Sequence, residues 1–106
     1  MKNMEPVDVF KALANESRIR ILKWLGDPDR YFPVDPENEE GHSEELGVCV
    51  GLLQKKTGLS QSTVSHYLAI LQKAGLVTAH RQGQWTYYKR NEKALKAVAR
   101  FLKEEI

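Results

Sequence analysis

The segment 59–77, LSQSTVSHYLAILQKAGLV, decides the fold around which the rest of the sequence is organised. Ser60 is a typical N-cap and Gly75 a typical helix stop, so the pattern predicts a helix over about 60–74. Apolar residues with helical spacing should face the core, and these are Val64, Leu68 and Leu71. The opposite face is polar, short-chained and free of acidic residues, and it comprises Ser62, Ser65, His66, Ala69 and Lys73.

A shorter helix is predicted just before this one, over about 50–57, and it should stop at Gly58. A short helix, a glycine turn and a second helix form a helix-turn-helix. The second helix of this motif fits the major groove of DNA when its outer side chains are small and not acidic. Ser, Thr, Gln and His can then contact base edges and phosphates. The preceding segment 47–50 is compatible with a short strand or with the buried entry to the helix.

The residues after Gly75 change from helical to strand-like periodicity. Two β-branched and aromatic runs, 76–81 and 85–89, flank a turn centred on Gly83, which predicts a β-hairpin. Such a basic hairpin, over about 77–89, is a wing that can reach the backbone or minor groove. Asn91 should cap a final helix with an apolar stripe of Leu95, Val98 and Leu102, flanked by Ala94 and Phe101.

The N-terminal part predicts two helices and a loop. The first helix covers about 6–14, and the second follows the N-cap Asn15 with Arg18, Ile21, Leu22 and Leu25 on one side and Ile19 beside them. Gly26 is expected to end the second helix in the left-handed conformation. The acidic, proline-containing insert at about 27–46 is predicted to be a loop or mobile segment, anchored by Tyr31, Phe32 and Val34.

Charge is segregated along the chain. Residues 27–45 hold eight acidic residues and one basic residue, whereas residues 54–90 hold six basic residues and no acidic one. An acid-free basic stretch favours a polyanionic partner, although a chance cluster on a solvated face is the alternative.

Composition restricts the class of protein further. The chain has 106 residues, 42% hydrophobic and 28% charged, so we expect one globular domain over 1–106. A single cysteine excludes an internal disulfide and a zinc site with several thiolates. Because no signal peptide or membrane-spanning run is evident, we expect a soluble, cytoplasmic protein with no membrane partner.

Three strings resemble one known family. FKALANESRIRIL at 10–22, LSQSTVSHYL at 59–68 with LQKAGLV at 71–77, and RQGQWTYY at 81–88 are similar to the motifs of ArsR/SmtB winged-helix repressors. The resemblance extends over about 80 residues and lies mainly outside the insert and the termini. It implies a mainly α protein with a small β-hairpin (α+β), a winged helix-turn-helix that dimerises through its first and last helices.

The resemblance also implies roles for individual residues. The chain would be a homodimeric repressor on a palindromic double-stranded DNA operator, with recognition helices about 34 Å apart. The DNA-reading residues would be Ser60, Gln61, Ser62, Thr63, Ser65, His66 and Tyr67, with Lys73 on the same face, and His80, Arg81, Gln82, Gly83, Gln84 and Trp85 in the wing. The dimer interface is expected to contain Val7, Phe10, Leu95, Val98, Phe101 and Leu102.

The chain departs from the metal-sensing members of that family. Val48 and Val50 occupy the places of a cysteine pair, the final helix lacks histidine, and we expect no metal and no cofactor. Cys49 between them is either a buried small side chain or a thiol sensor. His42, among acidic residues, either is solvated or binds a divalent cation weakly. If the protein responds to a small-molecule or redox effector, the sequence does not indicate the identity of that effector.

Two other classes of function compete with DNA binding. The winged helix can instead be a protein–protein interaction module whose basic face docks an acidic partner, and the acidic insert can fold back to mask that face. An enzyme that uses Cys49 with His42 or His66 would need a group to orient the base, and none accompanies the thiol. We therefore predict that the protein is not an enzyme.

Overall fold

A computed structural model describes residues 4–33, 42–43 and 45–106. The elements in that part of the chain are α1 (Pro6–Leu13), α2 (Glu16–Leu25), α3 (Pro28–Tyr31), β1 (His42–Ser43), β2 (Gly47–Cys49), α4 (Val50–Thr57), α5 (Gln61–Lys73), β3 (Val77–Gln82), β4 (Trp85–Arg90) and α6 (Glu92–Glu105). The predicted class, mainly helical with a small antiparallel sheet in a winged helix-turn-helix, is confirmed. Among the described helices, none combines the length and apolar composition needed to cross a bilayer.

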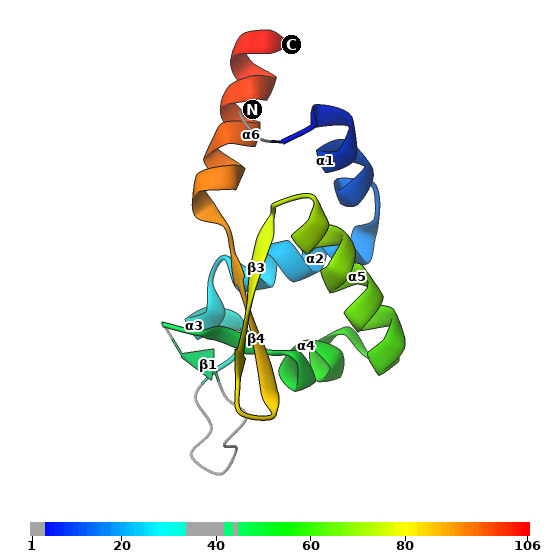
Figure 1. Cartoon of the computed structure of the whole chain (residues 1–106), viewed down its shortest axis with the longest axis vertical. Coiled ribbons are helices and arrows are strands. Elements are labelled where there is room, and N and C mark those ends of the chain that lie inside the picture. Colours follow the sequence, from blue (N-terminus) through cyan, green and yellow to red (C-terminus); the bar gives the residue numbers. More distant parts are fainter. Residues whose placement is uncertain (1–3, 34–41, 44) are drawn as a thin grey trace.

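The two ends of the molecule have different content (Figure 1). The helices α1 and α6 lie at one end, together with the C-terminus, and the tip of the β3–β4 hairpin lies at the other. The helix-turn-helix of α4 and α5 stands beside the hairpin, and Gly58 makes its turn with a φ of 72°, a conformation that favours glycine.

The sheet contains more than the predicted hairpin. Its order is β1-β2-β4-β3 and all pairs are antiparallel. Segment 47–49 is a true strand, because Val48 pairs with Tyr88 and Cys49 with Tyr87. The strand β2 leads directly into α4, so the sheet fixes where the helix-turn-helix begins.

The core contains the apolar stripes predicted for α2 and α5, whereas α1 buries Val9 and Ala12 and leaves Val7 exposed. Fully buried side chains come from α1, α2, β2, α4, α5 and the segment before β3, and they are Val9, Ile21, Val48, Cys49, Leu53, Val64, Leu68, Leu71 and Leu76. The expected caps are present, since Asn15, Ser60 and Asn91 each accept a hydrogen bond from the backbone amide three residues later.

Two predictions for α2 are wrong. Ile19 is 51% exposed rather than packed beside the core stripe. Gly26 has a φ of −77°, in the right-handed region, so α2 does not end in the left-handed conformation. The guanidinium of Arg90 lies against this glycine, so a Cβ here would make the arginine side chain shift.

The insert is more structured at its start than a loop. The four-residue helix α3 follows Asp27, and Phe32 after it is buried. The sequence signal for this was the pair of aromatic residues at 31–32, which we interpreted only as an anchor. Residues 34–41 and 44 lie outside the described residues, and this includes Val34 and the centre of the acidic run.

Arg90, at the end of β4, joins three elements. Its guanidinium donates two hydrogen bonds of 2.7 Å to the carboxylate of Glu92 and one of 3.4 Å to the backbone oxygen of Leu22 in α2. The hydrogen bonds from Arg90 lower the pKa of Glu92, which is the second residue after β4 and opens α6. The pair therefore holds the wing, α2 and α6 together.

The depressed pKa of Glu92 predicts a pH-dependent contribution to stability. A carboxylate whose pKa falls on folding stabilises the protein above its usual pKa of 4.5, and this contribution is lost as the pH falls through the lowered value. Glu92→Gln should reduce the free energy of unfolding at neutral pH by up to about 1 kcal/mol, because the pair is half exposed, and change it little in strong acid. Urea unfolding at several pH values measures this.

The matched control is Glu104→Gln, which removes an exposed carboxylate paired with Arg100 in the last turns of α6. We expect little change in the free energy of unfolding for this variant at any pH. Equal losses for both variants across the pH range would contradict a specific role for Glu92.

Candidate nucleic-acid interface

The buried face of α5 determines which of its faces is exposed to solvent. Because Val64, Leu68 and Leu71 are fully buried, the helix cannot rotate without exposing them. The residues left exposed are Gln61, Ser62, Ser65, His66, Ala69, Gln72 and Lys73, and no acidic residue is present in the helix. This face can donate hydrogen bonds to, and accept them from, a polyanion without charge repulsion.

The hydroxyls at the start of α5 are partly committed to the helix itself. The Oγ of Ser60 accepts from the amide of Thr63 at 3.2 Å and donates to its Oγ1 at 2.9 Å, and the Oγ of Ser62 lies 3.2 Å from it. Within the described part of the chain, Gln61 and Ser65 have no such hydrogen bond. Their exposed side chains are thus the freest on this face to contact a ligand.

Tyr67 differs from the other predicted DNA-reading residues. It is half-buried and packs against the core, and its ring lies under the guanidinium of Arg18, 5.2 Å from ring centroid to Cζ. The Nδ2 of Asn15 also donates to its hydroxyl at 3.5 Å. Tyr67 therefore holds α5 against α2 and has less surface for a ligand than its neighbours.

Arg18 extends this contact to α1. Its Nε donates to the backbone oxygen of Ala12 at 2.6 Å, and its terminal nitrogen donates to that of Lys11 at 3.1 Å. These carbonyls lie at the C-terminus of α1, where a cation is favourable. The sequence signal was an arginine on the apolar side of α2, which we noted but did not assign.

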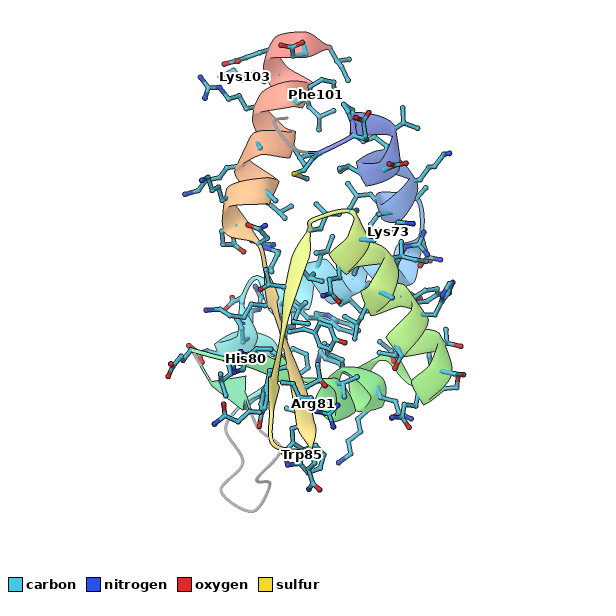
Figure 2. The ribbon with its side chains drawn as sticks, in the orientation of Figure 1. Lys73, His80, Arg81, Trp85, Phe101 and Lys103 are labelled. Carbon is cyan, nitrogen blue, oxygen red and sulfur yellow. The ribbon has the colours of Figure 1, made fainter. Side chains whose placement is uncertain are left out.

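The wing presents an exposed outer strand. Val77 of β3 is buried, whereas the rest of the strand is exposed, including His80, Arg81 and Gln82. The Nε of Arg81 donates to the backbone oxygen of Gly83 in the turn at 3.3 Å. Figure 2 shows Trp85 close to the tip of the hairpin, and its side chain is half-buried. Gln84 is exposed in the same turn.

The inner strand of the wing anchors the hairpin. Of the two adjacent tyrosines, Tyr88 packs against the core, as expected for alternate residues of a strand, and its burial raises the pKa of its phenol. The phenol is therefore neutral at physiological pH.

The end of the acidic insert reaches the outer strand of the wing. Glu45 lines a hollow of about 640 Å³ together with Leu46, Thr78, Ala79, His80, Gln82 and Lys89. Acidic and basic side chains thus line the same hollow beside β3.

At the other end of the molecule, α1 and α6 contact each other through aromatic rings. The ring centroids of Phe10 and Phe101 are 6.2 Å apart, and Figure 2 shows Phe101 directed toward α1 and Lys103 on the other side of α6. Apolar side chains left exposed at this end are Val7 at 62%, Leu102 at 48% and Ile106 at 80%. Ile106 was not among the residues that we predicted for the dimer interface.

One predicted interface residue has little surface to offer a partner. Val98 is only 4% exposed and belongs to the core of its own chain, because α6 turns this side of its stripe inward. Leu95 also packs partly against that core.

The structure bears on the two residues that were considered as a sensor or a cation ligand. Cys49 is a free cysteine with no exposed surface, in the strand that pairs with β4, which favours packing over a sensor role. The side chain of His42 lies outside the description. Among the described residues, no group of three His, Cys, Asp or Glu side chains can hold a metal ion.

Comparison with known proteins gives consistent results. The family model for bacterial regulatory proteins of the arsR family matches residues 45–79. The uncharacterized HTH-type transcriptional regulator YbzH of Bacillus subtilis is 52% identical, over 97% of this chain and 100% of that protein. The arsenical resistance operon repressor of Escherichia coli is 31% identical, over 84% of this chain and 62% of that protein.

A solved structure has a similar fold. The homodimeric winged helix-turn-helix DNA-binding domain Mb0332 of Mycobacterium bovis, a possible ArsR-family regulator, superimposes with a TM-score of 0.62. It is 29% identical, and the match covers 91% of this chain and 73% of that one.

The contacts of Arg18 predict a specific loss of stability. Arg18→Ala removes the stacking on Tyr67, the donor to the carbonyl of Ala12 and one of two donors to that of Lys11, so the free energy of unfolding should fall by about 1–3 kcal/mol. Arg20→Ala is the matched control, because Arg20 makes only an exposed i,i+4 pair with Glu16 and should cost below about 0.5 kcal/mol. Urea unfolding that gives equal losses for the two variants would exclude this role.

Proposed function

Because the chain belongs to the arsR family of bacterial regulatory proteins and is a DNA-binding transcriptional regulator, not an enzyme, we propose that it acts as a homodimeric repressor on a two-fold operator. The observation that carries the proposal is the exposed, acid-free face of α5 beside the exposed strand of the wing. A helix with such a face enters the major groove, and an adjacent basic hairpin reaches the backbone.

Within this face we assign roles by freedom of the side chains. Gln61, Ser65 and His66 are exposed near the start of α5 and suit base edges or phosphates. Ser60 and Thr63 cap the helix, which keeps the helix N-terminus ordered for a phosphate. Arg81 and His80 of the wing, and Lys73 at the far end of α5, supply positive charge or donors to the backbone.

The dimer is supported by the apolar surface of α1 and α6 and by the homodimeric structure of the related domain. Val7, Leu102 and Ile106 are exposed apolar side chains at the end where these helices meet. Two copies joined there by a two-fold axis would present two recognition helices about 34 Å apart, one turn of DNA. Binding across a promoter would then block transcription; the Escherichia coli relative is named as an operon repressor.

The alternative is that the basic face binds an acidic protein. The hollow in which Glu45 meets the outer strand of the wing favours it, because this strand already has an acidic neighbour. Selection of bound sequences from random duplexes separates the two functions. A regulator of the proposed kind enriches a two-fold repeat, and a protein-binding module enriches none.

Substitution of the free side chains of α5 tests the recognition face. On the selected operator, Gln61→Ala and Ser65→Ala should each reduce discrimination against mismatched duplexes by about 1–3 kcal/mol if they contact base edges. Gln72→Ala, on the same helix but at its other end, is the control and should preserve discrimination. If Gln61→Ala and Ser65→Ala both keep full discrimination, or if Gln72→Ala loses it, then α5 does not contact base edges through the start of the helix as proposed. Competition binding at constant salt is the measurement.

Substitution at the α1–α6 end tests the dimer. Leu102→Asp should weaken self-association at least about tenfold, because the interface would desolvate an unpaired carboxylate. Ile19→Asp is the control, since Ile19 is equally exposed but lies on α2. Sedimentation at several protein concentrations compares them. A Leu102→Asp protein that remains dimeric would reject this interface.

A further inference from the structure

Three aromatic rings surround the ammonium group of Lys56. The Nζ atom lies 5.2 Å from the ring centroid of Trp24, 5.6 Å from that of Tyr31 and 5.6 Å from that of Phe32. The rings come from α2, from α3 and from the residue after α3, and the lysine comes from α4. We call the three rings the aromatic cage.

The geometry of the cage is that of a cation-binding site. Each ring is within the distance of about 6 Å at which the ring face attracts a cation. The guanidinium of Arg30 lies over the ring of Tyr31 as well, 5.2 Å from its centroid, so a second cation is drawn to the same group of rings. Rings from separate elements that converge on one point are the arrangement by which proteins bind ammonium compounds.

The cage is rigid and its occupant is not. Phe32 is 6% exposed, and Trp24 and Tyr31 pack against the hydrophobic core. Lys56, by contrast, is exposed, and it sits in the last turn of α4 on a flexible four-carbon stem. Its ammonium can leave the rings for water without moving any part of the core.

We propose that the aromatic cage is a binding site for a small organic cation of the alkylammonium class, and that Lys56 occupies it in the absence of that ligand. The ligand exchanges one ammonium group for another, so the rings keep a cation between them. A methylated ammonium is favoured over a lysine side chain because it is less strongly hydrated and covers more of the ring faces. This inference goes beyond the proposed function, because it concerns a site for an effector and not for DNA.

Because Lys56 competes with the ligand for the aromatic cage, its removal has a predictable effect on ligand binding. Because Lys56 is part of the chain, its effective concentration at the cage is in the millimolar range or above. A free ligand must compete with it, so removal of the lysine side chain should strengthen ligand binding. Lys55 precedes it in the same helix and is also exposed, but in the described structure no ring contact is recorded for it, and it provides the matched control.

The test uses choline as the probe and Trp24 as the reporter. The chain has two tryptophans, so Trp85→Phe leaves Trp24 as the single tryptophan, which is excited selectively over the tyrosines at the long-wavelength edge of the protein absorption. In this background and without DNA, choline should change the fluorescence saturably, and Lys56→Ala should bind it about tenfold more tightly than the parent. Lys55→Ala should bind like the parent, and Tyr31→Leu should bind more weakly. Circular dichroism checks that each variant is folded.

A neutral analogue separates a cation site from an apolar cleft. The compound 3,3-dimethylbutan-1-ol has the shape of choline without its charge and should bind far more weakly. Equal binding of the two compounds overturns the proposal, and so does the absence of a saturable response in both the parent and Lys56→Ala. Because no DNA is present, these outcomes do not depend on the proposed operator binding.

Discussion

The burial of one stripe of α5 is the constraint on which the rest of the structure depends. Val64, Leu68 and Leu71 have no exposed surface, and each buried side chain of this kind contributes about 1.5–3 kcal/mol. A rotation of α5 that turned its polar face inward would lose this contribution and bury hydroxyls and a histidine without partners. The core therefore selects which face of α5 is exposed, and this is the face that we propose for DNA recognition.

A second set of contacts connects that helix to the opposite end of the molecule. Arg18 stacks on Tyr67 of α5 and donates to the last carbonyls of α1, so the helix that carries the proposed dimer surface and the recognition helix share one side chain. Arg90 does the same for the wing, which it joins to α2 and α6. Two arginines thus link α5, the wing and the end formed by α1 and α6, and the two-fold operator that we propose would require such rigidity.

The aromatic cage lies in the same framework. Its rings extend from α2 to the first residues of the insert, and Lys56 belongs to the helix before the recognition helix. An effector that displaces Lys56 would act on the helix-turn-helix without any metal or thiol chemistry. The full burial of Cys49 agrees with such an arrangement, because a buried thiol between paired strands has no access to solutes.

The sequence by itself determined the local elements and the order in which they occur. The caps Asn15, Ser60 and Asn91, the stripe of α5 and the glycine turn of the hairpin are encoded within a few residues, because helix capping, amphipathic spacing and turn geometry depend on near neighbours. The resemblance of three strings to the ArsR/SmtB family implied the winged helix-turn-helix independently of these local signals.

The tertiary structure decided what lies between those elements. The guanidinium of Arg90, distant in sequence, lies against Gly26; Val98 faces its own core; and Tyr67 joins Asn15 across 52 residues. The cage likewise unites α2, α3 and α4. No local pattern specifies such contacts, because they arise only when separate helices and strands pack and fix which side of each one meets which neighbour.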